Sequence, residues 1–452
     1  MPHSVVQDEQ RPSSFDAHHP PERQHIDECV HCGFCLPACP TYVLWGEEMD
    51  SPRGRIYMIK KAAEGAAPVD ERFRQHMDNC LGCMACMTAC PSGVEYNKLI
   101  EPVRAQIERN APRGAGESFL RRLIFATFPY PARLRLLGIP LVVYEKSGLR
   151  ALVRATGVLN RLPKRLAAME ALLPDLPPEL FTRLPAVVWP KSAPRRRVGM
   201  LTGCVQRVFF PHVNAATARV LAAEGCEVVI PREQACCGAL MVHSGLEEEA
   251  AALARKTIAV FEAAQVDAVV VNSAGCGSTM KEYGYLLRDD PKWAGRAAAF
   301  SAKCKDIAEL LCELEPQAPR HALKLRAAYH DACHLQHAQG VRDQPRRLLA
   351  AIPELEVAEI PEGSLCCGSA GVYNLLQPDA ANALGDRKVE NLLSTRAQAV
   401  LSANPGCLLQ LMNGLRRRGL KAMPTFHMVE LLDASIRGAS VDNLLRGRAN
   451  KV

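Results

Sequence analysis

The sequence predicts a multidomain protein in which a mainly α-helical module precedes a duplicated α/β domain. Three observations support this prediction. Two runs of four cysteines share one spacing, a second group of cysteines recurs at a nearly constant offset, and short apolar segments alternate with helical patterns around that group. We expect four parts with these bounds: 20–110, 111–194, 195–320 and 321–438, of which the last two are copies of one unit.

The bulk composition limits the class of protein. The chain has 452 residues, 48% hydrophobic and 23% charged, as expected for a globular protein with several domains. No run of eighteen apolar residues predicts a membrane span, and the polar start lacks the apolar core of a secretory signal. The nineteen cysteines lie largely at metal-ligand spacing, which predicts reduced thiolates in a cytoplasm. The net charge of +7 is mild, and no basic motif with interleaved aromatics indicates nucleic-acid binding.

Each early cysteine run has the form Cys-x2-Cys-x2-Cys-x3-Cys-Pro. Such runs ligate [4Fe–4S] clusters in two-cluster ferredoxins, where the fourth cysteine of each run serves the other cluster. Structural zinc sites usually have two cysteine pairs separated by a longer loop, so we favour two clusters over zinc. The expected ligands are Cys29, Cys32, Cys35 and Cys90 for the first cluster, and Cys80, Cys83, Cys86 and Cys39 for the second.

The segment between the two runs predicts helices in this ferredoxin-like module. Apolar residues recur at helical spacing in Pro52–Lys61 and again in Phe73–Cys80. A mostly helical module is therefore expected, rather than a small β-rich one. Arg53 and Arg55 fall near the expected cluster sites, where they could raise a potential or dock a partner, although a role in beginning a helix is equally consistent.

Residues 111–194 contain no cysteine and are rich in Arg, Leu and Pro. The pattern of Phe119–Tyr144 is compatible with helix, although we expect prolines such as Pro131 and Pro140 to interrupt it. We favour a helical linker packed on the later domain over an amphipathic surface that meets a partner or a membrane. The proline-dense stretch Pro174–Pro194 then leads into the next domain.

The later part of the chain repeats four cysteines in register. The first copy contains Cys204, Cys236, Cys237 and Cys276, and the second contains Cys333, Cys366, Cys367 and Cys407. The offsets between the copies are 129, 130, 130 and 131 residues, a register that chance does not produce. Three further cysteines have no counterpart and are expected to be structural: Cys226, Cys304 and Cys312.

Both copies predict the same local structure around these cysteines. Short buried strands are expected at 198–202, 267–272, 325–329 and 397–402. Helical patterns occupy intervening segments such as Glu247–Ala264 and Pro378–Leu393. Alternating strands and helices form parallel sheets, which hold ligands at the carboxyl ends of their strands. The repeated cysteines occur at such strand ends.

In each copy a Cys-Cys pair is followed by glycine, which permits a tight turn that directs both thiolates at one centre. Four soft ligands per copy suit an iron–sulfur cluster or tetrahedral zinc. We favour a cluster slightly over zinc, and buried structural cysteines are the remaining alternative. His330, Asp331 and His334 flank Cys333, either as outer partners of a metal or as hydrogen-bonding groups at a strand end.

Two resemblances follow from these motifs. The Cys-Cys-Gly copies resemble the cysteine-rich domains of heterodisulfide-reductase-type proteins. The module is similar to the iron–sulfur subunits of flavin-dependent hydroxy-acid dehydrogenases, and His31–Tyr42 with Asp50–Ile56 resembles the glycolate oxidase (glycolate dehydrogenase) iron–sulfur subunit family. The resemblance spans about residues 25–438. Heterodisulfide-reductase domains that hold a double cluster end in Cys-x-x-Cys, whereas this chain has Ser273 and Asn404 at the first of these positions.

The resemblance implies an electron-transfer subunit of a glycolate dehydrogenase complex, an oxidoreductase acting on a CH–OH donor. A partner subunit would hold FAD and oxidise glycolate to glyoxylate, and this chain, without catalytic residues or a Gly-x-Gly-x-x-Gly motif, would pass electrons towards quinone or another acceptor. A cytoplasmic location, with peripheral contact on the inner face of the membrane, is expected. Alternatives in the same class are subunits of lactate or glycerol-3-phosphate dehydrogenase or of a heterodisulfide-reductase-like complex. A non-enzymatic iron–sulfur redox scaffold is the alternative from another class.

Overall fold

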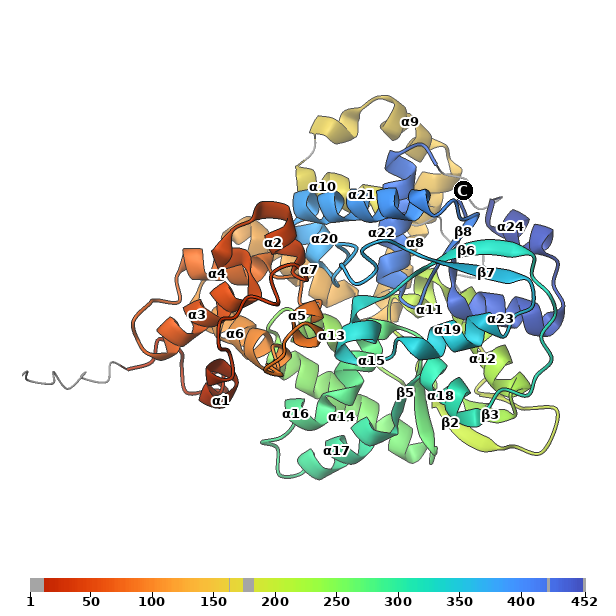
Figure 1. Cartoon of the computed structure of the whole chain (residues 1–452), viewed down its shortest axis with the longest axis horizontal. Coiled ribbons are helices and arrows are strands. Elements are labelled where there is room, and N and C mark those ends of the chain that lie inside the picture. The colour runs from red at the N-terminus through yellow and green to blue at the C-terminus, as the bar shows by residue number, and fades with distance from the viewer. Residues whose placement is uncertain (1–11, 162, 174–182, 421–422, 450–452) are drawn as a thin grey trace, which may run out of the picture.

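The computed structural model describes residues 12–161, 163–173, 183–420 and 423–449. Figure 1 shows a helical module in red and orange at one end, linker helices in yellow, and two α/β units in green to blue. The predicted fold class is confirmed: helices dominate the N-terminal part, and two parallel sheets follow.

The N-terminal module is built from helices. They are α1 (Arg23–Asp27), α2 (Pro40–Trp45), η1 (Glu48–Asp50), α3 (Pro52–Ala63), α4 (Glu71–Asn79), α5 (Ala85–Thr88) and α6 (Asn97–Asn110). Helices α3 and α4 coincide with the two helical patterns of the sequence. Ser51 and Asp70 cap their N-termini by accepting hydrogen bonds from Gly54 and Phe73. The apolar faces of α3, α4 and α6 meet in one core, against which cysteines of both runs pack.

Five short helices form the linker: α7 (Ala115–Thr127), α8 (Pro131–Lys146), α9 (Leu149–Ala155), η2 (Val158–Arg161) and α10 (Lys164–Ala171). Pro131 begins α8, as an N-terminal proline can. The expectation that Pro140 interrupts the helix is wrong, because it lies inside α8. Its missing N–H would have met the carbonyl of Leu136, a residue that is 67% exposed, so water can solvate that carbonyl. Of the proline-dense stretch, residues 174–182 lie outside the described residues.

The first copy forms a five-stranded sheet. Its strands are β1 (Val187–Val188), β2 (Arg196–Met200), β3 (Cys226–Val229), β4 (Ala268–Val271) and β5 (Cys304–Asp306), in the order β1-β3-β2-β4-β5. All pairs are parallel except β1 with β3. The helices are α11 (Gln206–Phe209), α12 (Pro211–Ala223), α13 (Ala239–Val242), α14 (Glu247–Ala263), α15 (Ala274–Lys281), α16 (Tyr283–Leu286), α17 (Ala294–Lys303) and α18 (Ile307–Leu314).

The second copy repeats this topology with four parallel strands. They are β6 (Leu325–His330), β7 (Leu355–Glu359), β8 (Ala399–Ser402) and β9 (Thr425–His427), in the order β7-β6-β8-β9. The helices are η3 (His334–Ala338, a π-helix), α19 (Asp343–Ala350), α20 (Tyr373–Leu376), α21 (Pro378–Ser394), α22 (Pro405–Arg417), α23 (Met428–Arg437) and α24 (Val441–Ala449). The order β3-β2-β4-β5 of the first copy corresponds to β7-β6-β8-β9, as the repeated cysteines predict.

The two copies pack against each other and share one core. One apolar core contains Val198 and Val270 of the first sheet together with Ala327 and Leu401 of the second. Helix α12 packs against α23, where Arg219 forms an ion pair with Asp433 at 2.7 Å. This packing brings the two groups of repeated cysteines to one side of the joint core. In the described part of the chain, no helix has the length and apolarity that crossing a bilayer requires.

Candidate functional site

Four cysteines expected to bind the first cluster gather at the module's surface. Cys29, Cys32, Cys35 and Cys90 line one small pocket of about 30 Å³, together with Cys86. Cys32 is exposed and the other three are partly buried. Burial, followed by the neighbouring thiols of Cys90 and Cys32, raises the pKa of Cys29. We call these four residues the surface set.

The other four early cysteines, Cys39, Cys80, Cys83 and Cys86, lie deeper in the module, and we call them the inner set. Burial, and then the thiols of Cys83, Cys80 and Cys39, raises the pKa of Cys86 well above its ordinary value. Four thiols per set are the donors that a [4Fe–4S] cluster requires, so the residues present fit two clusters.

Two arginines supply positive charge beside the inner set. Arg55 is fully buried, forms an ion pair with Asp50 at 3.0 Å, and places Nη1 4.0 Å from the Cys39 sulfur. Burial alone would raise the pKa of Cys80, but Arg55 and Arg104 outweigh it and lower that pKa. The two guanidinium groups therefore stabilise the thiolate form of Cys80 against the cost of burial. Arg104 has no signal in the sequence, because it enters the site from α6, outside both cysteine runs.

Arg53 takes a different position from Arg55. It pairs with Glu48 at 2.7 Å and donates a hydrogen bond to the carbonyl of His31, beside the surface set. Both arginines also belong to the first turn of α3, so the helix places one guanidinium near each set of thiols. A role beside the cluster sites and a role in beginning helix α3 are therefore compatible for these arginines.

The inner set touches the second copy directly. Cys83 packs with Leu365 and Cys366 in a buried apolar cluster. Burial, and then the thiol of Cys333, raises the pKa of Cys83 well above its ordinary value. The ring Nε2 of His334 lies 2.8 Å from the carbonyl oxygen of Gly82, which fixes the loop that carries Cys80 and Cys83. A cysteine of the module and two cysteines of the second copy are thus neighbours.

The four repeated cysteines of the first copy come together at the carboxyl ends of β2 and β4. The sulfurs of Cys204 and Cys236 are 3.4 Å apart. Cys237 lies between Cys236 and Cys276, and hydrogen bonds to both thiols, with burial, raise its pKa. Gly238 has φ = +81° and its N–H donates to the Cys236 sulfur at 3.4 Å, which confirms the tight turn expected after the cysteine pair.

The second copy gathers its four cysteines in the same way. The sulfurs of Cys333 and Cys366 are 3.9 Å apart, and Cys367 lies between Cys366 and Cys407. Gly368 has φ = +89°, and a Cβ there would lie 2.5 Å from the carbonyl oxygen of Ala381. Only glycine fits this turn. Both copies therefore present four close soft donors, which fit an iron–sulfur cluster or zinc.

Ser273 and Asn404, which replace the first cysteine of the Cys-x-x-Cys pattern, meet across the two copies. The Ser273 hydroxyl donates to Asn404 Oδ1 at 3.3 Å, and the two residues precede α15 and α22. Cys276 and Cys407 occupy the third position of these helices. Asn404 Nδ2 also donates to the Cys407 sulfur at 3.4 Å.

A large cavity joins the two copies at this point. It has a volume of about 590 Å³ and is lined by cysteines of both copies, among them Cys204, Cys276, Cys333 and Cys407. Apolar side chains of the linker, such as those of α8, complete its wall. No pattern in the sequence predicts this cavity, because it forms where the linker and both copies meet.

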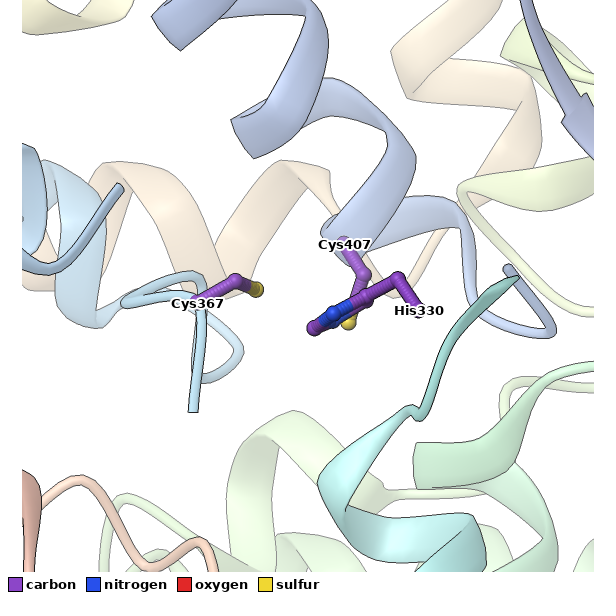
Figure 2. Close-up of side chains that lie close together, drawn as sticks. All are labelled: His330, Cys367 and Cys407. Atoms are coloured by element: carbon purple, nitrogen blue, oxygen red, sulfur yellow. The ribbon is translucent and has the colours of Figure 1, made fainter. Parts of the chain in front are cut away.

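The residues that flank Cys333 have separate roles. Asp331 forms an ion pair with Arg346 at 2.7 Å, and His334 binds the module through Gly82. His330 is fully buried, and burial lowers its pKa to about 3, so the ring is neutral near pH 7. Its nitrogens lie close to the sulfurs of Cys367 and Cys407, as Figure 2 shows. Lys388, which the sequence analysis missed, is a buried lysine whose charge acts on Cys366 and Cys367.

The three cysteines without repeat partners lie away from these groups. Cys226 and Cys304 begin β3 and β5 and are fully buried. Burial raises the pKa of Cys226 to about 11 and raises that of Cys304 well above its ordinary value. The sulfur of Cys312 faces the carbonyl of Gln344. These positions are those of packing residues.

Three family models match the chain. A 4Fe-4S dicluster domain matches residues 25–94, the linker region of the glycolate oxidase iron–sulfur subunit matches 116–173, and a cysteine-rich domain matches 198–281 and 327–412. Together with the thiol sets, these matches define an iron–sulfur electron-transfer subunit with a duplicated cysteine-rich domain. The prediction of two [4Fe–4S] clusters is confirmed at the level of the domain.

Relatives identify the family more closely. A probable glycolate oxidase iron–sulfur subunit of Bacillus subtilis (strain 168) is 41% identical over 421 residues, 91% of this chain and 95% of the relative. The glycolate oxidase iron–sulfur subunit of Escherichia coli (strain K12) is 38% identical over 84% of this chain and 88% of the relative. Lactate utilization protein A of an Exiguobacterium species is 30% identical over 54% of this chain and 99% of the relative. The chain belongs to the family of glycolate oxidase iron–sulfur subunits and is a component of an oxidoreductase complex.

Proposed function

We propose that this chain carries single electrons from FAD-containing subunits, which oxidise glycolate to glyoxylate, towards a quinone. The observation that carries the proposal is the series of thiols from exposed Cys32, through Cys86 and Cys83, to Cys366. The surface set and the inner set would each hold one [4Fe–4S] cluster. Bound clusters supply one-electron acceptance and release at potentials that their surroundings tune.

The exposed end of the series suits docking of the flavin-containing partner. Val30 and Phe34, on either side of Cys32 in the chain, are each 67% exposed. Exposed apolar side chains grouped beside a functional site are typical of protein interfaces. The Arg53–Glu48 pair borders the same face and supplies a polar rim. The surface set would therefore receive electrons from the partner.

Side chains around the inner set prepare it for negative charge. Gly82 N–H and Tyr96 Oη donate to the Cys80 sulfur at 3.4 and 3.7 Å. Such hydrogen bonds, together with the positive charge of Arg55, stabilise added electron density and raise the reduction potential. Burial of Cys80 and Cys83 excludes water.

The cavity between the copies suits the quinone. Its volume of about 590 Å³ falls within the usual range for small-molecule sites, and its wall includes Leu134, Leu137 and Leu141 of α8. Leu137 is also 45% exposed, so the cavity wall continues into the protein surface. An apolar channel mouth beside the thiols would admit a quinone ring and leave its hydrophobic tail towards the outside.

The linker around this mouth suits contact with an anionic membrane. Residues 131–171 contain eight Lys and Arg but only two acidic residues. Leu136, Val143 and Leu152 are 67%, 62% and 59% exposed on the same helices. Exposed apolar residues combined with basic ones favour the interface of a bilayer that carries anionic lipids. Peripheral contact would bring the cavity to the quinone pool.

The proposal is tested on the complex purified with its flavin-containing partners. Glycolate should reduce a short-chain quinone, and glycolate should also reduce a dye that takes electrons directly from the flavin. Leu141→Arg, which places a charge in the cavity, should lower quinone reduction but spare dye reduction. Leu136→Arg, on the same helix but exposed, is the matched control and should change neither.

Three outcomes would contradict parts of this proposal. Reduction of the quinone by lactate but not by glycolate would identify lactate as the substrate in place of glycolate. Loss of quinone reduction in Leu136→Arg as well as Leu141→Arg would remove the cavity as the quinone site. A chain that isolates without a flavin-containing partner and transfers no electrons would favour the redox scaffold instead.

A further inference from the structure

A histidine at the end of β6 has no hydrogen-bond partner despite complete burial. His330 is 1% exposed, and within the described residues neither of its ring nitrogens is hydrogen-bonded. An unpaired buried polar group is costly, so native proteins rarely retain one without a reason. Figure 2 shows the ring beside the sulfurs of Cys367 and Cys407, and the three donor atoms lie within 4.8 Å of one another.

The equivalent position of the first copy holds an apolar residue. The offset of 129 residues between Cys204 and Cys333 places Leu201 opposite His330. Leu201 packs with Cys236 and Cys237 in an apolar cluster. Ser402, the register partner of His330 on β8, is also fully buried with an unpaired hydroxyl. Buried polar atoms without partners also occur in the first copy, at Gln206 and Thr279, but the position equivalent to His330 is apolar there.

We propose that His330 binds the metal centre of the second copy through a ring nitrogen, beside Cys367 and Cys407. This inference rests on the proposed metal binding by the repeated cysteines. The centre would then have five donors, with Cys333 and Cys366 as the others, whereas the first copy offers four thiolates. The imidazole thus supplies a fifth donor, although Asn404 stands where the Cys-x-x-Cys pattern has its first cysteine.

The chemistry and geometry support this assignment. Neutral imidazole binds both iron and zinc through its unprotonated nitrogen, and in a buried ring without hydrogen bonds either nitrogen can take that role. The three donor atoms lie within 4.8 Å of one another, so all of them can reach one centre. A nitrogen donor in place of a thiolate also raises the potential of an iron–sulfur centre.

The test uses the full-length chain and a spectroscopic readout of nitrogen ligation. Metal lost from Cys366→Ser but kept in Cys236→Ser identifies the metal of the second copy. If that metal is iron, pulsed EPR should detect a strongly coupled nitrogen, and if it is zinc, X-ray absorption at the zinc edge should detect an imidazole. The signal should be absent from His330→Cys, which retains the metal through a thiolate.

Two further variants sharpen the test. His330→Leu introduces the residue that the first copy has at the equivalent position. It should lower the metal affinity of the second copy at least about tenfold, because removal of even an outer partner typically costs that much. His334→Gln is the matched control, because His334 is the next histidine along the chain and binds Gly82 instead. It should keep the nitrogen signal.

The outcomes separate this inference from the proposed function. A metal in the second copy without a nitrogen signal, or with a signal that persists in His330→Cys, would overturn the role of His330 and leave the proposed electron transfer intact. Absence of any metal attributable to the repeated cysteines would overturn their proposed metal binding, and the role of His330 with it.

Discussion

The two copies of the cysteine-rich unit place four thiols alike but surround them differently. In the first copy, Leu201 and Ile258 pack against Cys236 and Cys237. The equivalent positions of the second copy hold His330 and Lys388, both buried. Duplication has thus preserved the strand ends and the Cys-Cys-Gly turn, while the residues behind the thiols have diverged.

The copies also meet the module through different groups. The second copy contacts it through cysteines, with Cys83 packed against Cys366, as well as through the hydrogen bond between His334 and Gly82. The first copy meets it through polar contacts, in which Arg104 donates to the carbonyl of His243 at 2.8 Å. This comparison teaches that a repeat in sequence does not imply a repeat in role. In the proposed route, electrons leave the module through the second copy and reach the first copy after it.

The largest effect should come from breaking the thiol contact between module and second copy. Cys83→Ser should remove the inner cluster and reduce glycolate-dependent quinone reduction to background, because no other thiol of that set faces Cys366 so directly. Reduction of the flavin by glycolate should persist. Cys312→Ser, at a cysteine outside every thiol group, is the control. Quinone reduction that survives Cys83→Ser would refute the route.

The order of the two copies gives the next prediction. Cys366→Ser should prevent reduction of centres in both copies, because electrons reach the first copy through the second. Cys236→Ser should affect the first copy alone. Stepwise reduction monitored by EPR distinguishes the two cases, and equal effects of both variants would show that the copies receive electrons independently.

A smaller effect should follow from removing the buried lysine. Lys388 donates to the carbonyl of Glu362 at 2.5 Å, and the thiols of Cys367 and Cys366 oppose the effect of burial, which lowers its pKa. Lys388→Met removes a positive charge near the second-copy thiols and should lower the potential of that centre by about 60 mV, equivalent to ~1.4 kcal/mol for one electron. Ile258→Met at the equivalent position of the first copy is the matched control. Redox titration checks both variants, and an unchanged potential in Lys388→Met would remove the electrostatic role.

The smallest effect concerns the caps of two equivalent helices. Asp306 caps α18 with Glu309, and His427 caps α23 with Glu430. Burial raises the pKa of Asp306 to about 7 and lowers that of His427 to about 4. The contribution of Asp306 to the free energy of unfolding is complete below its unfolded pKa near 3.9 and is lost as pH rises to about 7. The contribution of His427 is complete above about pH 6.5 and is lost as pH falls to about 4.

The two caps therefore oppose each other between about pH 4 and 6.5. Asp306→Asn keeps a capping side chain but removes the loss of stability that Asp306 causes as pH rises. The free energy of unfolding of the variant, relative to that of the native protein, should therefore rise by up to about 1.4 kcal/mol per pH unit. Thermal melting of both proteins from pH 5 to 7 measures this difference. Parallel pH profiles would show that Asp306 titrates normally in the folded protein.

Local patterns in the sequence predicted much of the fold. The spacing of apolar residues predicted α3, α4, α14 and α21, and the short apolar segments predicted β2, β4, β6 and β8. Cysteine spacing predicted which residues could act together, because the ligands of one centre recur at fixed offsets. Pro140 was misjudged because a helix whose carbonyls reach water tolerates the missing N–H.

Features that depend on long-range packing were beyond the sequence patterns. Arg104 reaches Cys80 across 24 residues, and the cavity requires the linker and both copies. The burial of His330 and Lys388 could have been suspected only by aligning the copies and noticing that polar residues replace leucine and isoleucine. Such a substitution at a core position is a signal that can be sought in other duplicated domains.

The contact of Cys83 with the second copy constrains the order in which the protein can mature. Cys80 and Cys83 are each 8% exposed once the module is docked, and Leu365 and Tyr373 pack over the same site. A cluster delivered by another protein needs an open path to its ligands. Loading of the inner set must therefore precede docking of the module on the copies. A chain that folds without iron would bury these cysteines before a cluster could reach them.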